Sequence, residues 1–384
     1  MALTTSLILL VLLAAAVTTF ASPGLGAQGA ELLRGVLGDR ATADIESGMF
    51  RIQDVTNRVA YRLGLEKQSN PWAQESGGVA AARPTVPPAG LGAQTKKQVP
   101  EKQVPGRVWP PPSVPPLGFT AGEGQWSPYL VDAPGDVLGY RTVLRPDSSR
   151  PYAFTVVVAI DLERTRMHFV LGSKEPASAV SVARSGRIPA GFLKSGLLLA
   201  TFNGGFQARH GHFGAMANGV TVLPPLPGMG TVALYRSGRV KIGTWGKDVT
   251  PSNELVTWRQ NGPLIINQGT VNPHTADTAP KDWGIVVGGG SATWRSGVGV
   301  SADGRTLYYV AGRSLTLPAL ARAMADVGVY SGLQLDINRS WVHFEALAPA
   351  QTAKTLPLFD GMPADRRYLG SYKRDFFYLT LAPA

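Results

Sequence analysis

Beyond residue 119 the sequence is divided into short apolar runs separated by turn-forming residues, and this pattern limits the possible folds more than any other feature. The runs are rich in β-branched and aromatic side chains, which is typical of strands. Segments 236–239 and 301–305 resemble hairpin turns between successive runs, and the second contains an Asp-Gly pair. Successive strands are therefore expected to pair in antiparallel fashion. We expect strands at residues 153–161, 167–171, 197–202, 231–235, 240–244, 264–267, 292–300, 306–311, 332–336, 341–344 and 376–381.

One helix is predicted clearly, from Leu317 to Val327. Thr316 is a suitable N-cap, Pro318 lies in the first turn, and Gly328 follows the last apolar residue. The apolar side chains recur at helical spacing and form one stripe that can be buried. With few helices among many strands, we expect an α+β fold with a mostly antiparallel or mixed sheet.

The first 28 residues contain a segment that directs the chain to a membrane. Residues 3–21 are uncharged and mostly apolar, and a Ser-Pro-Gly sequence follows at once. This length lies between a long signal-peptide core and a short spanning helix, so residues 1–28 are expected to be a cleaved signal peptide or a retained membrane anchor. The body of the protein is then extracytoplasmic, and either membrane-anchored or secreted. The first basic residue, Arg34, follows the apolar run, so the distribution of charge does not support that orientation.

Two further segments precede the strand-rich body. Residues 29–69 are expected to be an amphipathic helical segment, because apolar residues recur at helical spacing between positions 41 and 65. That apolar stripe needs a partner, which is the main domain, the membrane surface or a second copy that would make the protein an oligomer. Residues 70–118 contain 11 of the 30 prolines and are expected to form a disordered linker. Residues 119–384 then form the folded domain.

Composition excludes several classes of site and partner. The chain has no cysteine, so disulfides, thiolate metal sites and a cysteine nucleophile are excluded. The motifs of zinc peptidases, α/β-hydrolases and P-loop nucleotide-binding proteins are also missing from the sequence. Residues 119–384 carry an excess of eight positive charges, which suits an anionic partner such as a carbohydrate phosphate or a lipid headgroup, although an ordinary solvated surface accounts for most of it. Because there is no dense basic run and no nucleic-acid motif, we expect no nucleic-acid partner.

Three segments contain the residue types of a ligand site. An Asn-Gly-Gly-Phe sequence at 203–206 follows a predicted strand, and its glycines allow the backbone to turn and approach a ligand. The segment 295–299 places an arginine at the start of a strand that contains alternating glycines. The third segment is a short apolar strand that ends at Asp336 and continues as Ile-Asn-Arg-Ser-Trp.

The order of these segments resembles the phosphodiester glycosidase family. The likeness extends from residue 156 to residue 381 and is strongest between Trp294 and Asp336. It implies a phosphodiester-glycosidase-like fold, and an enzyme that hydrolyses a phosphodiester-linked sugar of an envelope or surface glycopolymer. The residues that carry it are Asn-Gly-Gly-Phe at 203–206, Arg-Ser-Gly-Val-Gly at 295–299, a hairpin at 303–307, a helix that begins after Thr316, and Leu-Asp at 335–336.

The sequence departs from the family pattern directly after Asp336. The family continues its terminal aspartate as Asp-Gly-Gly-Gly-Ser-Ser, whereas Ile337 and Arg339 stand in this loop and cannot leave it equally open. One hypothesis is a hydrolase with altered substrate recognition. The alternative is a non-catalytic protein that retains the fold and binds or organises envelope glycans. A third hypothesis is a surface protein that assembles through residues 41–65.

Residue types suggest a role for each candidate. Asp336 would supply the carboxylate, Arg295 the cation for the departing phosphate, and Asn203 a hydrogen bond to the substrate. The structural alternatives are turn capping by Asp336, an internal ion pair of Arg295 and turn geometry at Asn203. The two histidines beside Gly211 leave a metal or a proton relay open, but no metal ligand is assigned and the cofactor is unknown. Further candidates for substrate binding are Gly204, Gly205, Asn338, Arg339, Trp341, His210 and His212.

Overall fold

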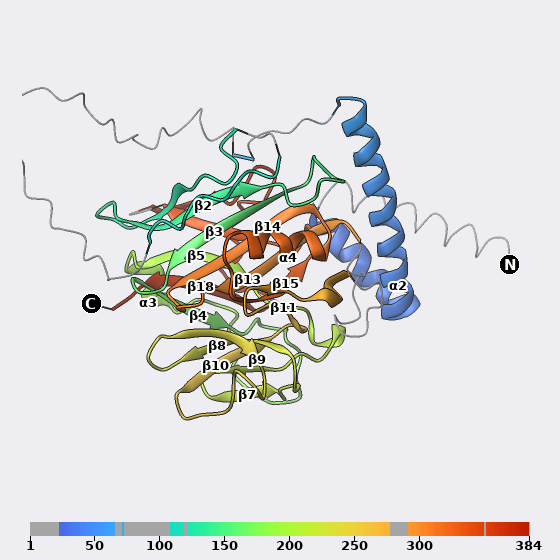
Figure 1. Ribbon diagram of the computed structural model, residues 1–384. Helices are drawn as coiled ribbons and strands as arrows, with labels where there is room; N and C mark the ends of the chain where they lie inside the picture. The colour runs from blue at the N-terminus through green and yellow to red at the C-terminus, as the bar shows by residue number, and fades with distance from the viewer. Residues whose placement is uncertain are drawn as a thin grey trace, which may run out of the picture.

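The computed structural model describes residues 23–65, 71–72, 108–118, 121–276, 291–348 and 351–383, and its strands form three sheets (Figure 1). The largest sheet has eight strands in the order β1 (Ser127–Val131), β2 (Val137–Leu144), β3 (Phe154–Asp161), β14 (Thr306–Leu315), β13 (Thr293–Val300), β15 (Ser331–Ile337), β11 (Leu264–Asn267) and β12 (Thr270–Val271). A five-stranded sheet has the order β17 (Gln351–Pro357), β16 (Phe344–Ala348), β5 (Leu198–Asn203), β18 (Phe376–Leu381) and β4 (Thr165–Val170). The other has the order β7 (Val220–Leu223), β6 (Ala215–Ala217), β10 (Leu255–Gln260), β8 (Gly230–Tyr235) and β9 (Val240–Thr244).

The helices in the described part of the chain are few, which agrees with the α+β prediction. They are α2 (Pro23–Arg62), the short α3 (Ala190–Lys194) and α4 (Leu317–Asp326), with 3₁₀ turns η2 (Ala208–His210) and η3 (Pro273–Ala276). The expected cap of α4 is present, because the Thr316 side chain accepts a hydrogen bond from the Ala319 amide.

Most expected strands are present with small shifts at their ends, and the paired named strands are antiparallel within the described residues. The hairpins β8–β9 and β13–β14 confirm the two predicted turns. The expected strand at 341–344 is wrong, because β16 begins only at Phe344. Asn338 has a φ of 80° and its carbonyl accepts hydrogen bonds from the amides of Trp341 and Val342, so the chain turns there. The sequence did not indicate β1, β2, β6, β7, β10, β12 and β17.

The eight-stranded sheet is buried on both faces, which explains its nearly continuous apolar strands. On β3, Val156 and Val158 belong to the core shared with β5, β16 and β18, whereas Val157 and Ala159 belong to the core beneath α4. Adjacent residues of a strand point to opposite faces, so one apolar strand contributes to both cores. The sheet is therefore held between α4 and the β5-containing sheet.

The folded body begins before residue 119. Residues 108–118 were expected to be linker, but the amides of Leu117 and Gly118 donate to the carboxylate of Glu123, and the amide of Val114 donates to Gly124. No helix within the described residues is apolar over a length that could cross a membrane. The apolar run at 3–21 lies outside the described residues, as does most of the expected linker.

Helix α2 lies along one side of the domain and is kinked at Gly38, where φ is 81° (Figure 1). It contacts the domain through Phe50, which is buried, and through Asp54, which accepts hydrogen bonds from Arg150 and Tyr152. The apolar stripe expected to be covered points the other way: the exposed fractions are 67% at Ile52, 60% at Val55, 48% at Val59 and 69% at Leu63. Within this structure, the main domain is not the partner of that stripe.

Candidate active site

The candidate site lies where chain segments from all three sheets meet. Asp336 is in β15 of the eight-stranded sheet, and Arg259 is in β10. Gly204 and Gly205 directly follow β5, and the pair Arg374–Asp375 directly precedes β18. Because these strands are anchored in apolar cores, the polar groups at their ends are held in place by residues outside the site.

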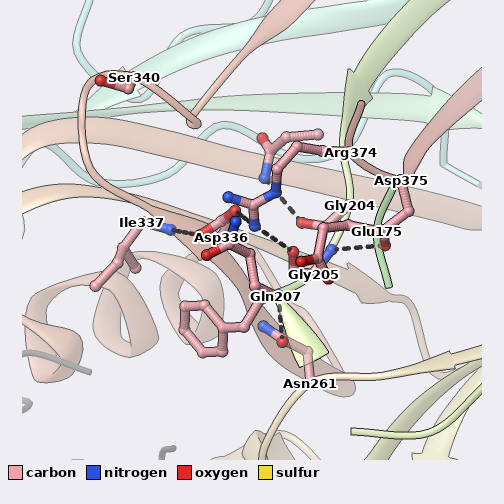
Figure 2. A network of polar contacts seen from close by, with 12 residues as sticks. Glu175, Gly204, Gly205, Gln207, Asn261, Asp336, Ile337, Ser340, Arg374 and Asp375 are labelled. Carbon is pink, nitrogen blue, oxygen red and sulfur yellow. Dashed lines mark hydrogen bonds and ion pairs between the residues drawn. The ribbon is translucent and has the colours of Figure 1, made fainter. Parts of the chain in front are cut away.

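Asp336 forms an ion pair with Arg374, and the two side chains face each other beside the Gly204–Gly205 backbone (Figure 2). Only 8% of the Asp336 side chain and 5% of the Arg374 side chain are exposed. The other carboxylate oxygen of Asp336 accepts a hydrogen bond from the Ile337 amide at 2.9 Å. Arg374 also donates to the Gly205 carbonyl at 3.1 Å, so one guanidinium connects the carboxylate to the glycine turn.

A second buried ion pair lies behind the first. Arg259 Nε is 2.9 Å from Asp375 Oδ2, which also accepts a hydrogen bond from the Gly205 amide at 3.2 Å. A Cβ atom at Gly204 would lie 2.5 Å from the same Asp375 oxygen, so only glycine fits there. Asp375 Oδ1 is buried and has no hydrogen-bond partner. One carboxylate oxygen therefore supports the turn, and the other remains available as an acceptor.

Burial controls the ionisation of this network. It raises the pKa of Asp336 to about 7, against the lowering effect of Arg374, and Asp375 contributes a further increase. Burial lowers the pKa of Arg374, but the negative charges of Asp336 and Asp375 outweigh it, so the pKa is raised and the guanidinium stays charged. Asp336 is thus a carboxyl group that can exchange a proton near neutral pH, next to a permanent cation.

The loop after Asp336 contributes one aromatic side chain to the network. The Arg374 guanidinium lies over the Trp341 ring at 4.4 Å from its centroid, and Lys373 Nζ is 5.5 Å from the same ring. Asn338 forms the turn described above, and its amide donates to the Trp294 carbonyl at 2.8 Å. Arg339 lies 6.0 Å from the Trp294 ring, and its Nε is buried without a hydrogen-bond partner. Of the three candidates in this loop, Trp341 is the one in contact with Arg374.

Asn203 lies next to Asp336, but its side chain is directed to other protein groups. Its amide nitrogen donates to the Gly204 carbonyl and to Ser296 Oγ, at 3.1 and 3.0 Å. Its oxygen accepts from the Tyr309 hydroxyl at 2.7 Å and from the His343 amide at 3.1 Å. All four hydrogen-bonding positions of the amide are therefore used inside the protein. Ser296 in turn donates to the Asp336 carbonyl at 2.7 Å, which links Asn203 to the site through the backbone.

Arg295 and Asp336 were expected to form one cluster, but Arg374 is the arginine that pairs with the aspartate. Arg295 donates to the carbonyls of Leu315 and Ser291 at 2.9 Å, and to Gln334 Oε1 at 2.8 Å. Burial lowers the pKa of Arg295 to about 9.

The two histidine candidates have different environments. His210 ends η2 and is half-buried; burial lowers its pKa to about 3, and the cations Arg34 and Arg374 act in the same direction. His210 is therefore a neutral imidazole at physiological pH. It lies close enough to interact electrostatically with both α2 and Arg374. His212 is exposed and has a φ of 50°.

Helix α2 covers the turn that contains the site. Phe50 forms one apolar cluster with Phe206, Phe213 and Ile337, the residue that follows Asp336. On the other side of the kink, Arg34 forms an ion pair with Glu46 at 2.9 Å, which joins the two parts of α2. Residues next to Asp336 therefore contact α2. Burial in this environment raises the pKa of Asp336.

The sequence missed Arg259, Arg374 and Asp375. Arg259 was missed because β10 was not recognised, since its polar end interrupts the apolar pattern. Arg374 and Asp375 could have been found from the sequence. The charged Lys-Arg-Asp sequence at 373–375 directly precedes the apolar strand β18, and charges next to a buried strand need partners.

A family model of the phosphodiester glycosidases matches residues 198–336, which is less than half of the 384 residues. The matched segment begins with β5 and ends at Asp336, so it includes all three motifs on which the resemblance rests. The match confirms that resemblance. Arg374 and Asp375 lie outside the matched segment, and no curated protein matches the chain.

Three solved structures are similar to the chain at low identity. The first is the catalytic domain of zebrafish N-acetylglucosamine-1-phosphodiester alpha-N-acetylglucosaminidase, auto-inhibited by pro-peptide, with 12% identity, a TM-score of 0.43, and coverage of 67% of this chain and 88% of that chain. The second is a hypothetical protein from Synechocystis, with 12% identity, a TM-score of 0.36, and coverage of 60% and 59%. The third is a putative exported protein from Burkholderia pseudomallei, with 13% identity, a TM-score of 0.31, and coverage of 65% and 76%.

Proposed function

We propose that the protein is a hydrolase that cleaves a sugar from a phosphodiester attached to its anomeric carbon. The observation that carries this proposal is the buried ion pair between Asp336, which ends the family-matched segment, and Arg374, with a carboxyl pKa of about 7 for Asp336. The substrate would be an anionic carbohydrate, such as a sugar-phosphate unit of an envelope or surface glycopolymer. The apolar N-terminal run would place the enzyme outside the cytoplasm, as an anchored or secreted protein.

The chemistry needs a carboxylate and a cation. In its ionised form Asp336 accepts a proton from water, and the water oxygen forms a bond to the anomeric carbon while the bond from that carbon to the phosphate oxygen breaks. The electron pair leaves with the phosphate monoester, whose charge Arg374 stabilises. A phosphate is a good leaving group, so the reaction does not depend on a strong general acid.

The remaining residues support this pair. We assign Asn203 a positioning role, because its hydrogen bonds fix Ser296, which holds the Asp336 carbonyl. The buried Oδ1 of Asp375, which has no hydrogen-bond partner, would accept a hydrogen bond from a substrate hydroxyl once the site opens. Trp341 would shield one face of the Arg374 guanidinium from water, which strengthens its interaction with a phosphate.

Access to this buried pair would depend on α2. Phe50 belongs to one apolar cluster with Phe206, which follows the glycine turn, and His210 interacts with both Arg34 of α2 and Arg374, so movement of α2 would open the site beside that turn. We therefore propose that α2 restricts entry of the substrate in the arrangement described here.

The test is hydrolysis of synthetic sugar-1-phosphodiesters by the full chain, measured as release of reducing sugar. Asp336→Asn should abolish turnover while the circular dichroism spectrum is retained. The matched control is Asp326→Asn at the end of α4, where the carboxylate pairs with Arg322 outside the site, and it should retain activity. Turnover that survives Asp336→Asn would contradict the proposal.

In this chain bulkier residues replace the glycine loop that follows the aspartate in the family. This replacement after Asp336 favours the alternative of a non-catalytic glycan-binding protein. The same assay distinguishes it. The wild type and Phe50→Asp, in which α2 is displaced, would both be tested. Saturable binding of the phosphodiesters by both proteins without turnover would support this alternative.

A further inference from the structure

A second cluster of ionisable side chains lies at the edge of β16. His343 directly precedes this strand, Glu345 is its second residue, and Asp365 lies in the segment between β17 and β18. His343 and Glu345 are two positions apart in extended chain, so their side chains share one face. One potential ligand atom from each of the three residues lies within 4.8 Å of the others.

The buried polar atoms of this cluster are not satisfied by the protein. The side chains of His343 and Glu345 have 0% exposure, yet Nδ1 of His343 and Oε2 of Glu345 have no partner, and the neighbour of His343 Nε2 is Glu345 Oε1 within the cluster itself. Thr201, which pairs with Glu345 across β5 and β16, also has a buried hydroxyl without a partner. Such groups are costly to bury, and a bound ion or water is a usual explanation.

The two separations from His343 are close to those between ligands of one metal ion. His343 Nε2 is 3.2 Å from Glu345 Oε1 and 3.8 Å from Asp365 Oδ1. Zn²⁺ bonds to nitrogen and oxygen of about 2.0–2.2 Å, arranged as a tetrahedron, place neighbouring ligand atoms about 3.3–3.6 Å apart. The three side chains could therefore bind one ion with only small adjustments.

The surrounding groups hold these side chains in place. The Arg366 amide donates to Glu345 Oε1 at 2.9 Å, and Arg367 binds the Asp365 carboxylate with contacts of 2.6 and 2.9 Å. The His343 backbone exchanges two hydrogen bonds with Asn203, both of 3.1 Å. Outer groups that orient carboxylates and imidazoles in this way raise the affinity of metal sites.

We propose that His343, Glu345 and Asp365 bind a divalent transition-metal ion, and that this ion is Zn²⁺. One imidazole and two carboxylates form a donor set that Zn²⁺ accepts, and three protein ligands leave a fourth position for water. Asp365 has 46% of its side chain exposed, so the ion can enter from that side. The ion would connect β16 to the segment before β18. This proposal does not depend on the hydrolase activity.

The experiment uses the tag-free full chain, stripped with a chelator and dialysed against Zn²⁺. Mass spectrometry should detect about one zinc per chain, and zinc should raise the melting temperature of the wild type. His343→Gln and Asp365→Asn should each weaken zinc binding at least about tenfold. The exposed His274→Gln is the matched control and should bind as the wild type does.

A second measurement keeps the proposal falsifiable if His343→Gln does not fold. Co²⁺ in place of Zn²⁺ should give the visible absorption of a four-coordinate site in the wild type, and Asp365→Asn should lose it. Asp365 is half-exposed, so this variant should retain the fold. Any of three results would overturn the proposal. These are a folded wild type that binds no zinc, zinc binding that is unchanged in both variants, and preferential binding of Mg²⁺ or Ca²⁺.

Discussion

The Asp336 carboxylate forms an ion pair with the Arg374 guanidinium, although the two residues are attached to different sheets. Each charge lowers the free-energy cost of burying the other, because removing an ion from water costs several kcal/mol. The pair therefore couples the end of β15 to the start of β18. A change in either residue should alter both the ionisation of the site and the local packing.

The pH dependence of hydrolysis should report the ionisation of Asp336. Because the carboxylate is the active form, the rate should rise with pH through about 7 and then level off. Arg374 lowers the pKa of Asp336, so Arg374→Gln should move this ionisation to higher pH and reduce turnover at neutral pH. The measurement is a pH–rate profile of kcat/KM for both proteins.

The control for this profile is Arg322→Gln on the surface of α4, where 61% of the arginine side chain is exposed. It should leave the profile unchanged. A profile of Arg374→Gln that coincides with that of the wild type would show that the Asp336–Arg374 pair does not govern the reaction.

Asn203 should contribute to stability rather than to substrate contact. Asn203→Ala would leave the Ser296 hydroxyl and the His343 amide with fewer partners in a buried position, and should lower the free energy of unfolding by about 2–3 kcal/mol. Urea titration would measure this loss. Asn57→Ala on α2 is the control, because its contact with Ser314 is long, at 3.4 Å, and the loss should stay below about 0.5 kcal/mol. A large increase in KM with unchanged stability would instead favour a direct substrate contact of Asn203.

Gly204 should not tolerate any side chain. The Cβ atom of Gly204→Ala would lie 2.6 Å from the Asp375 carbonyl oxygen, so the turn or the start of β18 must move. A displacement of about 1 Å in a catalytic arrangement costs about 100-fold in rate, and we expect at least this loss in kcat/KM. Gly370→Ala has no atom within 4 Å of the added Cβ and should retain full activity. Equal activity of the two variants would show that the turn is not part of the site.

Sequence patterns predicted those parts of the fold that depend on local chemistry. Helix α4 has its cap at Thr316 and an apolar stripe, and the hairpin β13–β14 has its Asp-Gly turn; both are present as expected. The strand β10 was missed because Arg259 and Gln260 are fully buried polar residues at its end. A charged residue inside a sheet is stabilised by partners from distant parts of the chain, and a local pattern does not contain them.

The candidate site was predicted only in part, because its ion pairs also join residues that are distant in the sequence. The motifs identified Asp336 and the Gly204–Gly205 turn, which lie together in the structure. They also suggested Arg295, but adjacent residues of a strand point to opposite faces, and in β13 it is Ser296 whose side chain contacts Asn203. The partner of Asp336 is determined by the packing of the sheets, which no spacing in the sequence reveals.

Displacing α2 should activate the protein. Phe50→Asp places a charge in the cluster with Phe206 and Ile337, which weakens the contact of α2 with the site. If the accessible form is a minor population, kcat/KM should rise at least about fivefold, in proportion to the gain in that population. The pKa of Asp336 should fall as its burial decreases, so the pH–rate profile should move to lower pH. The control is Ile52→Asp on the exposed face of the same helix, where 67% of the residue is accessible, and it should change neither quantity. Loss of activity in Phe50→Asp without a shift of the profile would mean that α2 completes the site instead of covering it.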